Sequence, residues 1–438
     1  MKGLLVLTAL FVAVFGKETF EGDQVLRITP RDEVQLTLLK DLSEMEYLQL
    51  DVWMETTDLS TSVDIRVPFT SLQTVKAFLE IEDIEYFIMI KDLQVMLDEE
   101  KEQMLSSARA TAPRTTDDYD YSNYHTIADI YAFQDMLVAE NPNLVSKIVI
   151  GQSYQGRPLN VLKFSTGGTS KPGIWLDTGI HSREWVTQAS GTWFAKKIVT
   201  DYGRDAALTA ILDKMDIFLE IVTNPDGYYY THTSNRMWRK TRKPNPGSSC
   251  IGTDPNRNWD AGFGGPGASD SPCSETYHGP KAHSESEVKS IVDFVKSHGN
   301  LKTFHPACIL HYMWPHQRKC GSNRHNLARK AITDLASLYG TSYRYGSIIN
   351  TICNGGTIDW TYNHGIKNSY TFELRDTSRY GFILPANQIL PTAKETWLAL
   401  MAIMEHTKDN TNYCYHCIIK RYNLGEFQRW SEYECHPF

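Results

Sequence analysis

His181 and Glu184 are separated by three positions in the string Thr178-Gly179-Ile180-His181-Ser182-Arg183-Glu184-Trp185. The string directly follows a short apolar run that predicts a strand ending at Ile180. Imidazole nitrogen and carboxylate oxygen are ligands that zinc accepts, and catalytic zinc sites use three protein ligands plus an open position. The spacing alone is weak, because it equally describes a surface histidine near a helix N-terminus. The strand before it favours two ligands of a catalytic zinc.

Two further clusters carry arginines, at residues 235–243 (NRMWRKTRK) and 254–260 (DPNRNWD). The planar guanidinium fork binds carboxylates in a bidentate manner. An enzyme that cuts peptides at the C-terminus must hold such a carboxylate. Taken alone, the first cluster is more simply explained as a solvated basic loop, and its value comes from its combination with the other motifs. The net charge of −8 and the lack of a second basic patch argue against nucleic-acid binding.

Glu373 lies in the strand-like string YTFELRDT at residues 370–377. A buried carboxylate is costly unless it is paired or functional. Beside a zinc ion such a group acts as a general base toward water. Taken alone, a structural ion pair with Arg375 is the plainer interpretation.

The elements that must position these residues fall into two regions. Residues 25–95 alternate short strand-like and helix-like stretches, which predicts a small α+β module with an antiparallel sheet. From residue 119, apolar runs such as 174–177 and 217–222 alternate with helical segments. That pattern predicts an α/β domain, a mixed, mostly parallel sheet sandwiched by helices, with its site at the carboxyl ends of strands.

Between the two regions, a charged segment at 93–105 predicts a helix, and a small, polar linker follows at 106–116. Such linkers are where proteases nick chains. Arg109 and Arg114 suit a trypsin-like protease, although an ordinary interdomain linker reads the same way.

The first sixteen residues have the features of a secretory signal peptide. Lys2 precedes an apolar run at 4–14, and no later apolar run is long enough to span a membrane. We therefore expect a secreted, extracellular protein, in which the eight cysteines can form disulfides.

Seven strings occur in one order: TGIHSREW, NPDGY, NRMWRKTRKP, DPNRNWDAGFGG, YHGP, GTIDW and TFELRDTSRYGFILP. In these strings the chain resembles the pancreatic-type zinc metallocarboxypeptidases of the A type. The resemblance runs from the signal peptide to about Asp409. It implies a signal peptide at 1–16, an inhibitory pro-domain at 17–110, a catalytic domain at 111–409 and an atypical tail at 410–438. It also implies activation at Arg109 or Arg114.

The resemblance assigns roles to individual residues. It implies one zinc ion per chain and a disulfide between Cys250 and Cys273. The implied site residues are His181 and Glu184 as zinc ligands, Arg239 at the scissile carbonyl, Asn256 and Arg257 on the substrate's terminal carboxylate, Arg183 as a secondary substrate contact, and Glu373 as the general base.

Ile358, in the string GTIDW, matches the base of the family's side-chain pocket. An acidic residue there would select Lys or Arg, whereas isoleucine cannot pair a buried cation. The resemblance therefore implies a preference for aromatic or large aliphatic C-terminal residues.

The segment 305–324 (HPACILHYMWPHQRKCGSNR) departs from the family pattern, which has the third zinc ligand here. His311 is the predicted ligand, because residues 307–310 read as a strand leading into it. Aligned without gaps, Cys308 falls at the ligand position, and His305 is the remaining alternative.

Two other segments also depart from the family. No tyrosine lies between Ser347 and Trp360, where the family carries one that closes over the substrate, and the tail at 410–438 adds Cys414 and Cys417. A shifted reading frame or an alternative exon would explain the segment 305–324 and the tail.

The sequence thus predicts a secreted, monomeric zymogen of a zinc carboxypeptidase. We expect peptides with free C-termini as substrates, a trypsin-like activating protease as a partner, and neither nucleic acid nor membrane. The alternative is a catalytically impaired relative that binds peptide C-termini without efficient hydrolysis.

Overall fold

The computed structural model describes residues 16–54, 59, 62–108, 113–309, 312–315, 322–345, 354–374 and 379–410. At residues 107–108, 306–309, 312–315, 322–325, 344–345 and 373 it describes the backbone only. Several predicted features therefore lie outside the described residues. They are the signal peptide up to residue 15, Arg109, His311, the segment 346–353 and the tail from residue 411.

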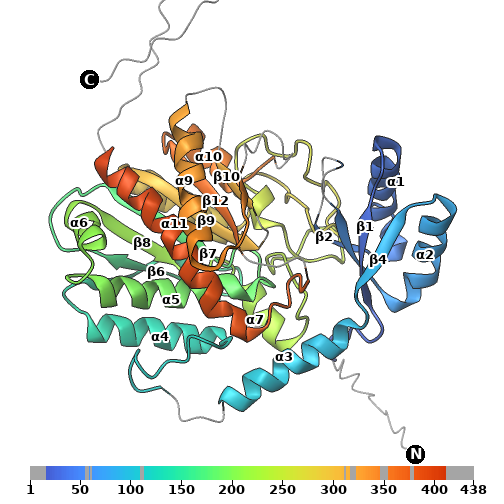
Figure 1. Ribbon diagram of the computed structural model, residues 1–438, viewed down its shortest axis with the longest axis horizontal. Coiled ribbons are helices and arrows are strands. Elements are labelled where there is room, and N and C mark those ends of the chain that lie inside the picture. Colours follow the sequence, from blue (N-terminus) through green and yellow to red (C-terminus); the bar gives the residue numbers. More distant parts are fainter. Residues whose placement is uncertain are drawn as a thin grey trace, which may run out of the picture.

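The N-terminal region forms a separate small domain (Figure 1). Its strands are β1 (Gln24–Thr29), β2 (Asp51–Met54), β3 (Val63–Val67) and β4 (Glu85–Ile90), and its helices are α1 (Glu33–Ser43) and α2 (Leu72–Ile81). The sheet has the order β2-β3-β1-β4, and every neighbouring pair is antiparallel. The alternating apolar positions of β1 and β3 pack under the two helices in a core of their own. The predicted α+β module with an antiparallel sheet is confirmed.

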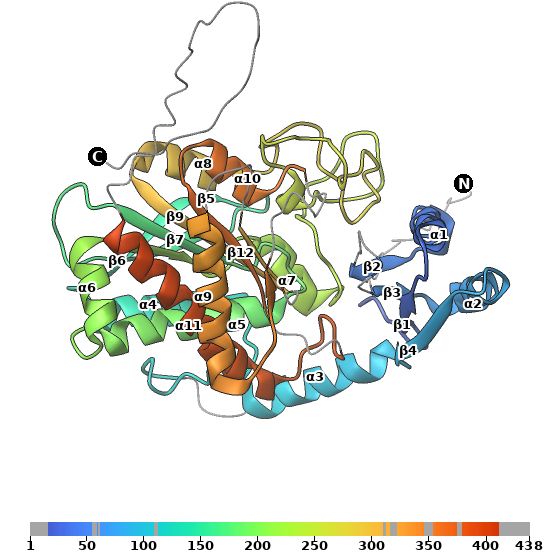
Figure 2. The same ribbon diagram turned by 45° about the horizontal axis from the view of Figure 1, so that its top comes forward.

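Helix α3 (Leu93–Ala108) connects the small domain to the larger one (Figure 2). The helix covers the predicted segment 93–105 and extends to the start of the linker. At the end of the linker, Thr116 is buried, and Glu140 accepts hydrogen bonds from its backbone N–H (2.7 Å) and from its hydroxyl. Arg114 is exposed.

The larger domain is built on an eight-stranded mixed sheet with the order β11-β10-β12-β9-β7-β8-β6-β5. Its strands are β5 (Val145–Gln152), β6 (Pro158–Phe164), β7 (Gly173–Thr178), β8 (Asp216–Glu220), β9 (Leu301–Ile309), β10 (Tyr312–Pro315), β11 (Arg344–Tyr345) and β12 (Asn368–Leu374). The central strands β8, β7, β9 and β12 are parallel, and β6 and β10 flank them antiparallel. The predicted fold class is confirmed.

Helices cover both faces of this sheet (Figures 1 and 2). They are α4 (Ile127–Glu140), α5 (Trp185–Asp201), α6 (Ala206–Lys214), α7 (Pro225–Thr233), α8 (Ser286–His298), α9 (Ser322–Tyr339), α10 (Thr357–Asn363) and α11 (Ile389–Asp409). Alternation along β7 decides which core each side chain joins. Ile174 and Leu176 pack toward α4, α5 and α11, whereas Trp175 packs on the opposite face with Phe304 and residues of α8.

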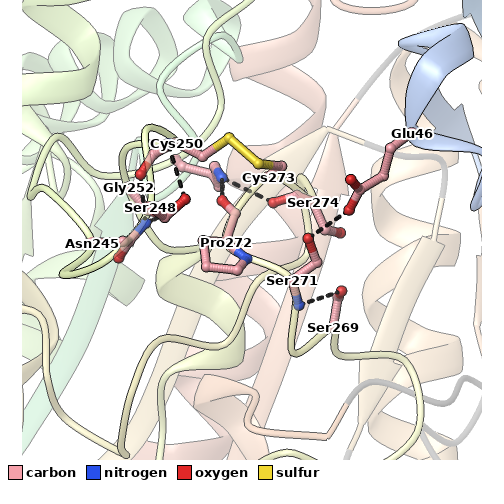
Figure 3. Close-up of a disulfide and its surroundings, with 11 residues drawn as sticks. Glu46, Asn245, Ser248, Cys250, Gly252, Ser269, Ser271, Pro272, Cys273 and Ser274 are labelled. Carbon is pink, nitrogen blue, oxygen red and sulfur yellow. Dashed lines mark hydrogen bonds between the residues drawn. A yellow bond between two sulfur atoms is a disulfide. The ribbon is translucent and has the colours of Figure 1, made fainter.

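A disulfide joins Cys250 to Cys273, with the two Cα atoms 5.1 Å apart (Figure 3). The predicted pairing is confirmed. The bridge holds a long loop between α7 and α8, and this loop reaches the small domain, where the hydroxyl of Ser271 donates a hydrogen bond to Glu46 (2.8 Å). Within the described residues, no helix is both long and apolar enough to cross a membrane.

Candidate metal centre and substrate cleft

The predicted ligand pair lies just past the carboxyl end of central strand β7. The strand ends at Thr178, two residues earlier than expected, and the chain turns at Gly179 with φ +72°. A Cβ on Gly179 would lie 2.7 Å from the side chain of Gln188, so both the turn and the close packing favour glycine. The turn brings His181 and Glu184 to the start of α5, with Nδ1 of His181 2.8 Å from Oε1 of Glu184.

Asp254 organises the groups around this pair. Its Oδ1 lies 3.2 Å from Nε2 of His181 and accepts a hydrogen bond from the backbone of Asn256 (2.8 Å). Its Oδ2 accepts two hydrogen bonds from the guanidinium of Arg239, at 2.8 and 3.2 Å. Burial opposes ionisation, but Arg239, His181 and Arg257 hold the pKa of Asp254 well below its usual value. The carboxylate is therefore ionised and orients the imidazole with Nδ1 toward Glu184.

These contacts meet the requirements of a zinc site as far as the described side chains extend. A histidine ligand typically turns its second ring nitrogen to a carboxylate, which fixes the ring orientation. His181 is held in this way by Asp254, and both His181 and Glu184 are almost fully buried. Among the described side chains, no third ligand completes the pair.

The segment predicted to supply the third ligand enters along β9. Ala307 pairs with Thr178 of β7, and Cys308 pairs with Glu373 of β12. The backbone thus places Cys308 at the same sheet edge as the residue predicted to be the general base. His311 follows β9 by two residues and lies outside the described part of the chain.

His305 occupies a different environment, in the middle of β9. Its Nε2 lies 2.8 Å from the hydroxyl of Thr303, and its ring stacks on Tyr370 at 5.8 Å between centroids. Burial lowers the pKa of His305 to about 3, so the ring is neutral. This placement explains His305 as a core residue and leaves Cys308 and His311 as the stronger candidates.

Arg239 lies beside the ligand pair, with Nη1 3.9 Å from Oε1 of Glu184. Burial works against its charge, but Asp254 and Glu184 raise the pKa of Arg239. Its main chain is tied to the loop at 179–184 that carries His181 and Glu184, called the ligand loop below, because the backbone N–H of Ser182 donates to the carbonyl of Arg239 (3.2 Å). A permanently charged guanidinium is thus held at the edge of the metal centre.

Asn256 and Arg257 follow Asp254 on one turn of 3₁₀ helix, Pro255–Arg257. Oδ1 of Asn256 accepts hydrogen bonds from the backbone and the hydroxyl of Thr357, both at 3.1 Å. Thr357 begins α10, and Ile358 is the next residue of that helix and is buried. The two predicted carboxylate-binding residues and the predicted pocket residue therefore share one connected unit.

Arg183 of the larger domain contacts the small domain. Its Nη1 donates to Oδ2 of Asp51 on β2 (2.7 Å). Its guanidinium carbon lies 4.2 Å from the ring centroid of Phe382, which also packs against Trp53 of β2 at 5.1 Å between centroids. The small domain thus covers the predicted secondary substrate contact.

A second contact holds the connecting helix. Glu100 of α3 pairs with Arg236 at 2.6 and 2.8 Å, and both side chains are buried. Arg236 stacks over Trp185 at the start of α5, 3.7 Å from the ring centroid. The linker that is predicted to be the activation site is therefore preceded by a firmly docked helix.

Asp254 is a functional residue that the sequence patterns did not indicate, although it lies in the string DPNRNWDAGFGG. A carboxylate directly before Asn256 and Arg257 could have been flagged as their counter-ion. Spacing alone could not show that it also contacts His181 and Arg239, which are distant in the sequence.

The comparisons with known proteins agree with this geometry. The zinc carboxypeptidase family model matches residues 130–399, and the carboxypeptidase activation peptide model matches residues 26–100. Carboxypeptidase A1 of Homo sapiens is 62% identical over 417 residues, covering 93% of this chain and 99% of that protein. The chain belongs to the zinc carboxypeptidase family, and it is a zinc-dependent metallocarboxypeptidase with an activation peptide, hence a zymogen.

Two solved structures support the assignment of the fold. One is that of thrombin activatable fibrinolysis inhibitor (TM-score 0.79, 32% identity, covering 89% of this chain and 100% of that chain). The other is the carboxypeptidase A of Helicoverpa armigera (TM-score 0.80, 25% identity, covering 90% and 99%).

We expect the substitution Asp254→Asn to weaken zinc binding by about 10- to 100-fold, the usual cost of removing a carboxylate that orients a histidine ligand. Competition with a chromophoric chelator measures the dissociation constant. Asp270→Asn is the matched control, because Asp270 contacts His278 (2.7 Å) in a similar pair. That pair lies in the disulfide loop, the segment between α7 and α8 that contains the Cys250–Cys273 bridge. Equal zinc affinity in the Asp254→Asn variant and the control would show that Asp254 does not orient a ligand.

Proposed function

We propose that this zymogen, once cut in its linker, releases aromatic and large aliphatic residues from the C-termini of peptides. The observation that carries the proposal is the cluster around Asp254. It connects the ligand pair, Arg239 and the Asn256–Arg257 turn at one edge of the sheet, close to the apolar start of α10.

We assign the zinc to His181, Glu184 and a third ligand, predicted as His311 with Cys308 as the competitor. When bound, zinc supplies Lewis acidity toward the peptide carbonyl. The residues of the chain divide the remaining work. Arg239 donates hydrogen bonds to the carbonyl oxygen as negative charge develops there, and Glu373 accepts the proton that the attacking water loses.

Asn256 and Arg257 hold the terminal carboxylate of the substrate, which places the last peptide bond beside Arg239. Arg257 suits this task because a guanidinium fork matches a carboxylate, and its burial strengthens the interaction. Arg183 contacts the substrate upstream of the scissile bond once Asp51 has left.

Ile358 sets the specificity. It is buried at the first turn of α10, directly after the residue that Asn256 holds. An apolar side chain there favours Phe, Tyr or Leu as the released residue. A lysine or arginine would leave a buried cation without a partner, which costs about 3–5 kcal/mol.

Secretion and activation complete the proposal. The apolar leader at 4–14 and the Cys250–Cys273 disulfide support a secreted, extracellular protein. A trypsin-like protease would cut at Arg114, which is exposed, or at Arg109. The alternative is an impaired relative, because the segment expected to give the third ligand departs from the family.

Blocked dipeptides ending in Phe or Arg test the proposal with trypsin-treated protein. We expect kcat/KM for Phe to exceed that for Arg by about 100-fold or more, the equivalent of an unpaired buried charge, and a metal chelator should abolish both activities. Ile358→Asp should reverse the order, with Ile366→Asp, a buried site in the core behind α10, as the control. Faster release of Arg by the unsubstituted enzyme would refute the specificity, and no release at all would favour the impaired relative.

A further inference from the structure

Asn224 joins three parts of the catalytic domain that are distant in the sequence. It is fully buried and caps the N-terminus of α7, where its Oδ1 accepts a hydrogen bond from the backbone of Gly227 (3.0 Å). Its own backbone N–H donates to the carbonyl of Gly179 in the ligand loop (3.1 Å). Its Nδ2 donates to the carbonyl of Lys240 (3.0 Å) and contacts that of Arg239 (3.5 Å).

The ligand loop holds the same segment from its other side. The hydroxyl of Ser182 donates to the carbonyl of Trp238 (2.6 Å). Arg239 is thereby fixed through its main chain from two directions, in addition to the contact of its guanidinium with Asp254. Such control matters because a displacement of about 1 Å can cost about 100-fold in rate.

We propose that Asn224 is a positioning residue, which fixes the distance of Arg239 from the ligand loop through its amide N–H groups. This inference rests on the proposed role of Arg239. The cap on α7 and the tether to residues 239–240 use different atoms of one side chain, so they can be separated.

Asn224→Asp separates them. The carboxylate keeps an acceptor for the cap but places oxygen against the carbonyls that the amide held. We expect kcat to fall by about 10- to 100-fold, with KM and zinc content unchanged. Asp205→Asn at the N-terminus of α6, whose side chain accepts from Leu208 (2.8 Å), is the matched cap substitution and should leave kcat unchanged.

A double-mutant cycle distinguishes positioning from general support. In an Arg239→Ala background, Asn224→Asp should change kcat by less than about twofold. If Arg239→Ala is slow and the second substitution still lowers kcat fully, the inference fails while the proposed function stands. If Arg239→Ala is as fast as the unsubstituted enzyme, the proposed role of Arg239 fails first. Should Asn224→Asp not fold, Ser182→Ala, which spares the cap, must show the same non-additivity.

A second, independent observation concerns Arg183, which faces two carboxylates from different domains. Its Nη1 lies 2.7 Å from Oδ2 of Asp51 in the small domain and 4.0 Å from Oε2 of Glu275 in the disulfide loop. Among the described residues, Oδ1 of Asp51, Nε of Arg183 and Oε2 of Glu275 are buried without a hydrogen-bond partner. The two carboxylates and Arg183 thus lie close together, and each keeps a polar atom that the hydrogen bonds of the site do not use.

The two carboxyl groups respond differently to this crowding. Burial raises the pKa of Glu275, and Asp51 raises it further, against the opposing effect of Arg183, Lys240 and Arg239. Burial also disfavours the charge of Asp51, but Arg183 and Arg66 outweigh it and lower the pKa of Asp51. One third of the Glu275 side chain is exposed, at 36%, but its Oε2 is shielded.

The geometry points to a proton-linked latch, in which Glu275 competes with Asp51 for Arg183, gains a proton when the small domain docks and loses it when the domain leaves. Glu275 has its higher pKa in the docked state, so its contribution to docking is present at low pH and is lost as pH rises through that pKa. Asp51 responds to pH in the opposite direction. Its contribution to docking is present above its ordinary pKa of about 4 and is lost as the pH falls below that value.

Full-length zymogen cut in the linker 106–116 provides the test, with the dissociation constant of the two pieces measured by sedimentation from pH 5 to pH 9. We expect the dissociation constant to rise with pH, by up to about tenfold per pH unit, which is the limit for one linked proton. Glu275→Gln should remove that slope and bind more tightly at pH 9. Glu46→Gln, which affects the separate contact with Ser271, should shift the constant and keep the slope.

Parallel pH slopes in the unsubstituted and Glu275→Gln proteins would overturn the latch. So would weaker docking of Glu275→Gln at pH 9. If that variant does not fold, Asp51→Asn serves instead, because it removes the repulsion from the other side. It should dock more weakly than the unsubstituted protein at pH 6 and show no slope from this pair.

Discussion

The ionised carboxylate of Asp254 is the group on which the arrangement of the site depends. Alone it would be costly to bury, and it is stable because cationic and hydrogen-bonding groups surround it. The carboxylate in turn fixes the orientation of these groups. The imidazole of His181 contacts its Oδ1, and the guanidinium of Arg239 donates to its Oδ2. One buried charge therefore aligns residues whose positions are 15 and 73 apart from it in the sequence.

Buried pairs of carboxylate and arginine also hold the small domain against the catalytic domain. Asp51 and Glu100 each pair with a buried arginine of the catalytic domain, and Trp53 packs on Phe382 between those contacts. The small domain has a core of its own, but Phe20, Val25, Trp53 and Ile90 also join the main hydrophobic cluster of the catalytic domain. Apolar packing and ion pairs therefore hold it in place together. Arg183, which we propose as a substrate contact of the cleaved enzyme, is thus paired with the small domain while that domain is docked.

Much of the fold follows from local sequence patterns. Apolar runs at 174–177 and 217–222 gave strands β7 and β8, and the charged segment from residue 93 gave α3. The family strings also predicted the residues that gather at the sheet edge. The roles of Asp254, Asn224 and Glu275 could not be predicted, because each depends on contacts between segments 15 to more than 200 residues apart. No spacing rule shows which carboxylate a given arginine will meet once the chain has folded.

We propose that His181 and Glu184, aligned by Asp254, bind one zinc ion. X-ray absorption at the zinc edge, combined with an anomalous difference map of the linker-cleaved protein, tests it most directly. We expect one zinc peak, bonded to Nδ1 of His181 and to the carboxylate of Glu184. A third bond of about 2.3 Å would identify Cys308, and one of about 2.0–2.1 Å would identify His311. Zinc bound elsewhere, or no zinc in folded, cleaved protein, would show that these two residues are not the ligands.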